Sequence, residues 1–111
     1  MKRTTEADLL KQVKLYLELK NVLVIRINSG AFAGVHQGRK RFVKLNSEPG
    51  CSDLLCCWPP KGKLLAIETK MPGKQPTAAQ ASFLCAVRQR GGVAAVIHDL
   101  DELQALLDSL D

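Results

Sequence analysis

The chain has 111 residues, of which 46% are hydrophobic and 24% are charged, proportions typical of one soluble globular domain. No apolar run approaches the roughly 20 residues that a membrane-spanning helix needs, so the sequence predicts no membrane insertion. The N-terminus is basic at first but lacks the apolar stretch of a secretory signal. We therefore expect a single domain over residues 1–111 that stays inside a cell.

The charge balance is basic, with 16 Lys and Arg against 11 Asp and Glu and a net charge of +5. Such a balance favours nucleic acid or another polyanion as partner. The four cysteines form no C-x-x-C pair and the two histidines lie far apart, which excludes a zinc knuckle and a thioredoxin-like motif. Without an export signal, we expect reduced thiols that behave as small buried apolar groups.

In the first half of the chain, periodicity predicts a helix and two strands. Residues Thr5–Lys20 place apolar side chains on one helical face, and the β-branched run Val22–Ile27 is typical of a strand. A glycine-bearing loop is expected over Ser29–Gly38, which lacks the G-K-[ST] of a phosphate-binding loop. Strand-like alternation resumes over Arg39–Leu45, behind a cluster of positive charge.

In the second half, two apolar runs flank Pro59–Gly62 and predict a β-hairpin. The remaining elements are a helix over Thr77–Arg90 that ends at Gly91-Gly92, a strand over Val93–His98, and a short helix that begins at a capping box over Asp99–Glu102. The predicted order is α-β-β-β-β-α-β-α. This order indicates an α/β fold with a mixed sheet flanked by helices.

The register of the hairpin brings charged residues together. If Pro59–Gly62 is the turn, Asp53 lies directly opposite Glu68, with Cβ atoms about 4.5–5.5 Å apart. Lys70 follows two residues after Glu68 and therefore shares its face. Two such carboxylates repel each other unless a cation lies between them, and oxygen ligands of this kind suit Mg²⁺ or Mn²⁺. The alternative is a surface salt bridge among the three residues.

These residues belong to a longer pattern. The string Pro49-Gly50-Cys51-Ser52-Asp53, the tripeptide Glu68-Thr69-Lys70 and Gln80 on the next helix together resemble the PD-(D/E)xK nuclease superfamily. Within it, the chain is most similar to the VRR-Nuc group. The resemblance implies a restriction-endonuclease-like core and a metal-dependent endonuclease that hydrolyses DNA phosphodiesters, leaving a 5′-phosphate.

The resemblance also implies a homodimer, because stand-alone members of the group are similar to Holliday-junction resolvases, and it implies selectivity for branched or junction DNA, as in DNA repair. We expect the cytoplasm of a bacterial or phage-infected cell as its location.

Site roles follow from the same resemblance. Asp53, Glu68 and the backbone carbonyl of Thr69 would hold Mg²⁺ or Mn²⁺. Lys70 would orient the attacking water or stabilise the transition state. Gln80 would join the site, although Thr77 and Gln80 also form a capping box that would hold this glutamine by itself.

Further residues have a functional and an ordinary interpretation. Glu6 matches a glutamate that binds metal through water in this group, but an acidic residue is also favoured in any first helical turn. Glu18 is a second candidate for that role. Cys51 would face Lys70, where a thiolate ligand is an alternative. The basic residues that could contact DNA phosphates, or simply be solvated charges, are Arg39, Lys40, Arg41 and Lys74, with Lys44, Lys61 and Lys63 as further candidates.

Two other functions stay open from sequence. One is a non-catalytic nucleic-acid-binding module on the same fold. The other is a metal-binding or thiol-regulated structural protein built around the cysteines.

Overall fold

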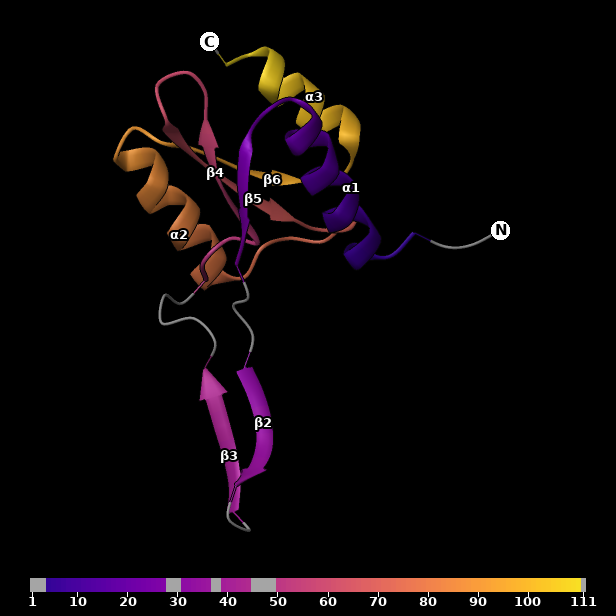
Figure 1. Ribbon diagram of the computed structural model, residues 1–111, viewed down its shortest axis with the longest axis vertical. Helices are drawn as coiled ribbons and strands as arrows, with labels where there is room; N and C mark the ends of the chain where they lie inside the picture. Colours follow the sequence, from indigo (N-terminus) through magenta and orange to yellow (C-terminus); the bar gives the residue numbers. More distant parts are fainter. Residues whose placement is uncertain (1–3, 28–30, 37–38, 45–49, 111) are drawn as a thin grey trace.

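The computed structural model describes residues 4–27, 31–36, 39–44 and 50–110, with 31–36 and 39–44 described by their backbone alone (Figure 1). In chain order the elements are α1 (Glu6–Leu19), β1 (Leu23–Arg26), β2 (Ala31–His36), β3 (Arg39–Lys44), β4 (Leu54–Trp58), β5 (Lys63–Thr69), α2 (Ala78–Gln89), β6 (Val93–Ile97) and α3 (Leu100–Asp108). Among the described residues, no helix is long and apolar enough to cross a membrane.

The centre of the fold is a mixed four-stranded sheet in the order β1-β4-β5-β6. The β1–β4 and β4–β5 pairs are antiparallel, and the β5–β6 pair is parallel. Parallel neighbours need a crossover, which α2 supplies. The predicted α/β class, with a mixed sheet flanked by helices, is confirmed.

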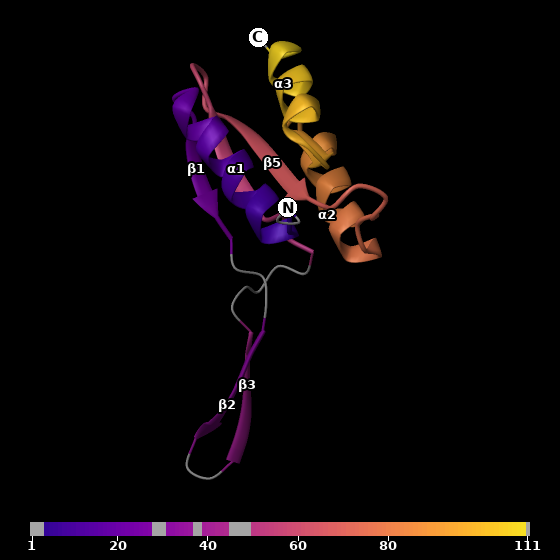
Figure 2. The same ribbon diagram turned by 90° about the vertical axis from the view of Figure 1, so that its right-hand side faces the viewer.

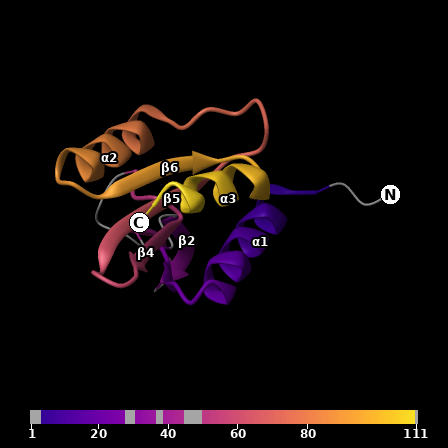
Figure 3. The same cartoon turned by 90° about the horizontal axis from the view of Figure 1, so that it is seen from above.

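Helices cover both faces of this sheet (Figures 2 and 3), with α1 and α3 on one face and α2 on the other. The larger core cluster lies under α1 and α3 and includes Leu17, Leu54, Ile67 and Leu103. A smaller cluster under α2 is built on Ala66, Leu84, Val87 and Ala94. Because β5 lies between both clusters, its last five residues are all buried.

The helix ends follow the sequence signals, with one exception. Thr5 and Thr77 begin α1 and α2 with complete capping boxes, and Gly91 follows α2 at a φ of 87°. At α3, Asp99 accepts a hydrogen bond from the Glu102 N–H at 2.8 Å. The Glu102 carboxylate, however, accepts from the His98 N–H at 2.9 Å. The predicted capping box is therefore only half formed, because His98 takes the return hydrogen bond.

The segment predicted as a loop contains a further strand. Residues Ala31–His36 form β2, which pairs with β3 from Ala31 opposite Lys44 to His36 opposite Arg39. These two strands make a separate two-stranded sheet, so the chain has the eight expected elements in order with β2 added. Cross-strand pairing stabilises β2, and such pairing is not visible in the local pattern of glycines that favours a loop.

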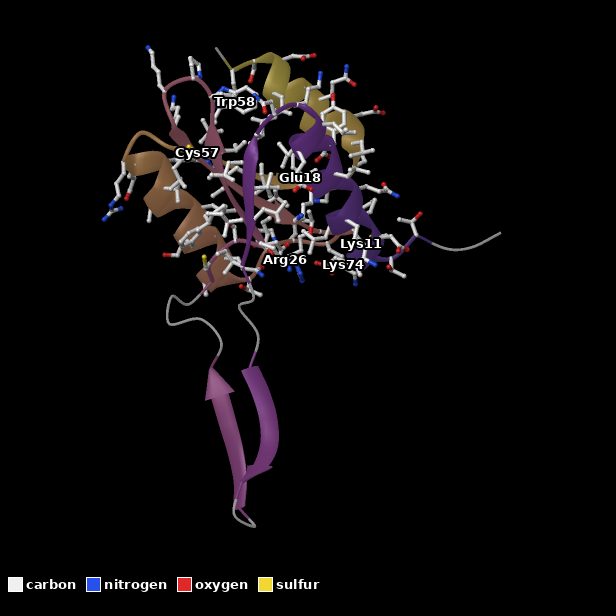
Figure 4. All side chains as sticks on the ribbon, viewed as in Figure 1. Lys11, Glu18, Arg26, Cys57, Trp58 and Lys74 are labelled. Atoms are coloured by element: carbon white, nitrogen blue, oxygen red, sulfur yellow. The ribbon has the colours of Figure 1, made fainter. Side chains whose placement is uncertain are left out.

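The β4–β5 hairpin has the predicted register, from Trp58 opposite Lys63 to Leu54 opposite Ile67. Cys57 and Trp58 lie at the turn end, far from the labelled Arg26 and Lys74 (Figure 4). Near this turn, Cys57 and Leu64 are exposed.

The cysteines divide into two environments. Cys51 and Cys56 are buried, and burial raises the pKa of the Cys56 thiol to about 12. Cys57 and Cys85 are exposed, which corrects the expectation of four buried thiols. Cys56 is therefore a structural residue with very little reactive thiolate at neutral pH.

Candidate metal-binding active site

The candidate site lies at one end of the four-stranded sheet. β1, β5 and β6 run in the same direction, so their carboxyl ends meet there beside the start of β4. Asp53 immediately precedes β4, and Glu68 and Thr69 end β5. The antiparallel β4–β5 hairpin therefore places Asp53 beside Glu68 at this end of the sheet.

Asp53 is held from both neighbouring strands. Its backbone carbonyl accepts a hydrogen bond from the Ile27 N–H at 2.8 Å. Its Oδ2 accepts two hydrogen bonds from Thr69, one from the backbone N–H and one from the hydroxyl, each 2.9 Å long. The Thr69 N–H of β5 thus donates to the Asp53 side chain and not to a backbone carbonyl of β4. The β4–β5 backbone pairing ends at Leu54 and Ile67, next to the site.

Glu68 is a buried carboxyl group with one unpartnered oxygen. The residue is only 2% exposed, and its Oε1 accepts a hydrogen bond from the Gln80 amide at 3.2 Å. Its Oε2 is buried and has no hydrogen-bond partner among the described residues. Burial first, and then the negative charge of Asp53, raise the pKa of Glu68 to about 8. A buried carboxyl in this state binds either a proton or a cation.

Lys70 is partly exposed directly after β5, and its backbone N–H donates to the Ile97 carbonyl at 3.1 Å. Its positive charge opposes the rise in the pKa of Glu68. The acid, acid and base that the hairpin register predicts therefore interact electrostatically.

Gln80 caps its helix and contacts the site at the same time. Its Oε1 accepts from the Thr77 N–H at 2.8 Å, and its Nε2 donates to Glu68. In the sequence, the capping role and the site role are alternatives for this residue. One amide satisfies both, because its oxygen and nitrogen point to different partners.

Gly50 explains how α2 reaches the site. Its φ is 72°, and a Cβ at this position would overlap the Ala79 carbonyl and lie 2.6 Å from the Gln80 nitrogen. Only glycine allows the chain before Asp53 to pass so close to the first turn of α2. Gly50 of the sequence motif therefore has a steric role, which is to allow Gln80 to lie beside Glu68.

Gly50→Ala is expected to lower the free energy of unfolding by more than about 3 kcal/mol, because it adds a backbone clash to left-handed strain. Gly73→Ala is the matched control, since Gly73 has a φ of 84° and no atom lies within 4 Å of the place that a Cβ would take. We expect that control to cost about 1–2 kcal/mol. Urea unfolding measures both variants, and equal losses would show that close packing on α2 contributes nothing.

Glu6, Glu18 and Cys51 are the remaining candidates for a place at the site. Among the described residues, no three His, Cys, Asp or Glu side chains gather as a metal cluster. Glu6 is exposed at the start of α1, and Glu18 forms an ion pair with Lys14 at 3.1 Å. Cys51 is buried but does not complete a cluster with Asp53 and Glu68, so a thiolate ligand is not supported.

The predicted DNA contacts are only partly within the described region. Lys74 is exposed four residues after Lys70, at the same end of the domain as Arg26 (Figure 4). Arg39, Lys40 and Arg41 begin β3, but their side chains lie outside the described part of the chain.

Two residues near the site escape prediction from the sequence. The Thr69 side chain holds Asp53, whereas the motif gives a role only to the backbone carbonyl of Thr69. Arg26 ends β1 opposite Leu54 and is exposed beside the site. No local feature of the sequence marks Arg26. For Thr69 there is one, because the middle position of the E-x-K tripeptide holds a residue whose side chain can form hydrogen bonds.

The donor set fits a hard divalent cation. Asp53 and Glu68 supply carboxylate oxygens, and the buried Oε2 of Glu68 lacks a partner among the described residues. The Thr69 N–H points to Asp53, and in an extended strand the carbonyl of the same residue points to the same side. Carboxylate and carbonyl oxygens are the ligands that Mg²⁺ and Mn²⁺ prefer.

Comparisons with known proteins agree with this architecture. No family model matches the chain, and no curated protein matches it. A solved structure described as "VRR_NUC domain" is similar over 98% of this chain and 100% of that chain, with a TM-score of 0.69 and 24% sequence identity. The fold implied by the motif is therefore confirmed, and the chain has the fold of a VRR_NUC domain.

Proposed function

We propose that residues 1–111 form one metal-dependent endonuclease domain that hydrolyses DNA phosphodiester bonds. The observation that carries this proposal is the buried Glu68 carboxyl beside Asp53 and Lys70, one oxygen of which has no hydrogen-bond partner within the described part of the chain. Structural carboxyl groups are seldom buried without a compensating partner. The fold of a VRR_NUC domain supports the same assignment.

Each site residue has a distinct task in this proposal. Asp53, Glu68 and the Thr69 carbonyl hold Mg²⁺ or Mn²⁺. A metal held by these residues would supply polarisation of the phosphodiester and a lowered pKa for a water molecule. Lys70 stabilises negative charge as it develops on the phosphoryl oxygens. Gln80 keeps the Glu68 carboxylate in place through its amide.

The distribution of charge supports DNA as the substrate. Between Leu54 and His98 the only acidic residue is Glu68, whereas six Lys and Arg residues lie in the same segment. By contrast, α3 carries acidic residues and no basic ones. We propose that DNA approaches the sheet end and α2, where positive charge is not offset.

A cleavage panel tests the function. Linear duplex, nicked, flap and four-way-junction DNA are incubated with the protein in Mg²⁺, in Mn²⁺ and in EDTA. We expect metal-dependent cleavage, fastest on branched DNA, with 5′-phosphate ends. DNA binding that persists in EDTA with no cleavage of any substrate would instead favour the non-catalytic binding module.

We also propose a homodimer, which would present two sites to two DNA strands. An apolar surface is available on the α2 side of the sheet, where Leu23 is paired with Cys57 and Cys57 with Leu64. Leu23 is 65% exposed and Ile25, two residues along β1, is 52% exposed. Contiguous exposed apolar side chains of this kind are typical of interaction surfaces.

Leu23→Lys is expected to shift the protein from dimer to monomer, because it places a charge within this apolar surface. Leu19→Lys is the control, since Leu19 is 77% exposed but lies on α1. Sedimentation velocity at several concentrations measures the change. A dimer that survives Leu23→Lys would place the interface elsewhere.

A further inference from the structure

We propose that the Thr69 hydroxyl is a positioning group that fixes the Asp53 carboxylate for metal binding. This inference rests on the proposed function, because it concerns how the same site is prepared for its cation. The resemblance assigns Thr69 a backbone role only, and its side chain adds a second and separate one.

Thr69 makes a paired contact with Asp53. It donates its N–H and its hydroxyl to the same carboxylate oxygen, Oδ2, at 2.9 Å each. Two donors on one oxygen define the plane of the carboxylate far better than a single donor does. They also leave Oδ1 as the oxygen that can bind a metal ion.

A buried hydroxyl at position 69 destabilises the fold unless it forms a hydrogen bond. Thr69 is 0% exposed. By strand alternation, its side chain lies on the same face as Leu65 and Ile67, both fully buried in the apolar core. Valine has nearly the same shape and would pack there without a polar group. A buried hydroxyl is unfavourable unless it is hydrogen-bonded, and the partner it has here is Asp53.

Asp53 needs such a restraint because other orientations compete. Its backbone is fixed by Ile27, but Asp53 is only partly buried, and its carboxylate lies close enough to Glu68 to raise the pKa of that group. A partly exposed carboxylate without such donors can rotate about its own side-chain bonds, and rotation displaces the oxygen that would bind the cation. The hydroxyl of Thr69 opposes this movement and keeps the metal-binding geometry in the metal-free protein.

The test compares three variants by Mn²⁺ titration calorimetry of the full chain without DNA. Thr69→Val keeps the shape and removes the hydroxyl, and we expect it to weaken Mn²⁺ binding by about 10–100-fold. Thr69→Ser restores the hydroxyl, and its Mn²⁺ affinity should return to within a few-fold of the wild type. Thr69→Cys introduces a smaller side chain that is only a weak hydrogen-bond donor, so it should weaken Mn²⁺ binding as Thr69→Val does. It replaces Thr69→Val in the test if the valine variant does not fold.

A second readout separates positioning from general damage. In Thr69→Val, the Mn²⁺ concentration for half-maximal DNA cleavage should rise with the dissociation constant, while the rate at saturating Mn²⁺ falls less. Thermal unfolding in EDTA should change little, because no cavity is created.

The outcomes distinguish the two proposals. Wild-type Mn²⁺ affinity in the hydroxyl-free variants, or equal losses in Thr69→Ser and Thr69→Val, would overturn the positioning role and leave the nuclease assignment intact. A wild-type protein that binds no Mn²⁺ and cleaves no DNA would overturn both.

Discussion

Glu68→Gln is expected to stabilise the metal-free protein at pH 9 and, in the same molecule, to abolish metal-dependent cleavage. Glu68 is buried beside Asp53, and its pKa is raised to about 8 from an ordinary value of 4.5. At pH 9 the folded protein therefore holds an unfavourable buried charge. Glutamine removes that charge, but it also removes the anionic ligand that the cation needs.

The pH dependence follows from the direction of this shift. Below about pH 4.5 the Glu68 carboxyl is protonated in both the folded and unfolded states, so it imposes no pH-dependent penalty. Between pH 4.5 and 8 the folded state keeps a proton that the unfolded state releases, so stability falls as the pH rises. Above about pH 8 both states are ionised and the full penalty, on the order of a few kcal/mol, remains.

Urea unfolding in EDTA at about pH 5, 7 and 9 measures this effect. The wild type should lose stability across the series, and Glu68→Gln should lose much less. An unpartnered buried amide costs about 1–3 kcal/mol, so the variant should be less stable than the wild type at the lowest pH and more stable at the highest. Added Mn²⁺ should restore the wild type at high pH but not the variant. Wild-type stability that is equal at both ends of the series would contradict the assignment.

Lys70→Ala is expected to lower the rate of DNA cleavage at saturating metal by about 10²–10³-fold, because it removes a positive charge that stabilises the developing phosphoryl charge. Its effect on DNA affinity should be small, since one phosphate contact among several is lost. Single-turnover cleavage in Mn²⁺, with binding measured separately, distinguishes the two effects.

The same variant should also change metal binding. The positive charge of Lys70 opposes the raised pKa of Glu68, so its removal should move the onset of Mn²⁺ binding to higher pH. Lys11→Ala is the control, because Lys11 is an exposed lysine on α1 with the same side chain. Undiminished cleavage by Lys70→Ala would exclude the proposed chemistry.

Much of the site is predictable from the sequence because it depends on short-range pairing. The turn over Pro59–Gly62 sets the hairpin register, and a register once set determines every opposed pair. Asp53 and Glu68 thus lie together as predicted, and Lys70 follows from strand alternation. The helix that carries Gln80 is equally predictable from the sequence, because a threonine cap marks its start and a pair of glycines marks its end.

Other features depend on contacts between distant segments. β2 exists through its pairing with β3, so the glycines of its segment favour a loop until the partner strand is known. Leu23 and Leu64 belong to apolar runs and are nevertheless exposed, because burial depends on which elements pack over the sheet and no hydrophobic pattern specifies that. The half-formed cap of α3 depends on His98, which competes for Glu102.

The sequence by itself determined the α/β class, the hairpin register and the group of Asp53, Glu68 and Lys70, because these follow from local periodicity and a tight turn. Only the tertiary structure decided the electrostatic state of that group. Glu68 is buried and one of its oxygens has no hydrogen-bond partner among the residues that the structure describes. Gly50 allows α2 to approach, and Thr69 holds Asp53 in place. Desolvation and close packing arise only when separate elements pack together. The sequence could therefore identify the site residues, but it could not give the burial or the raised pKa of Glu68.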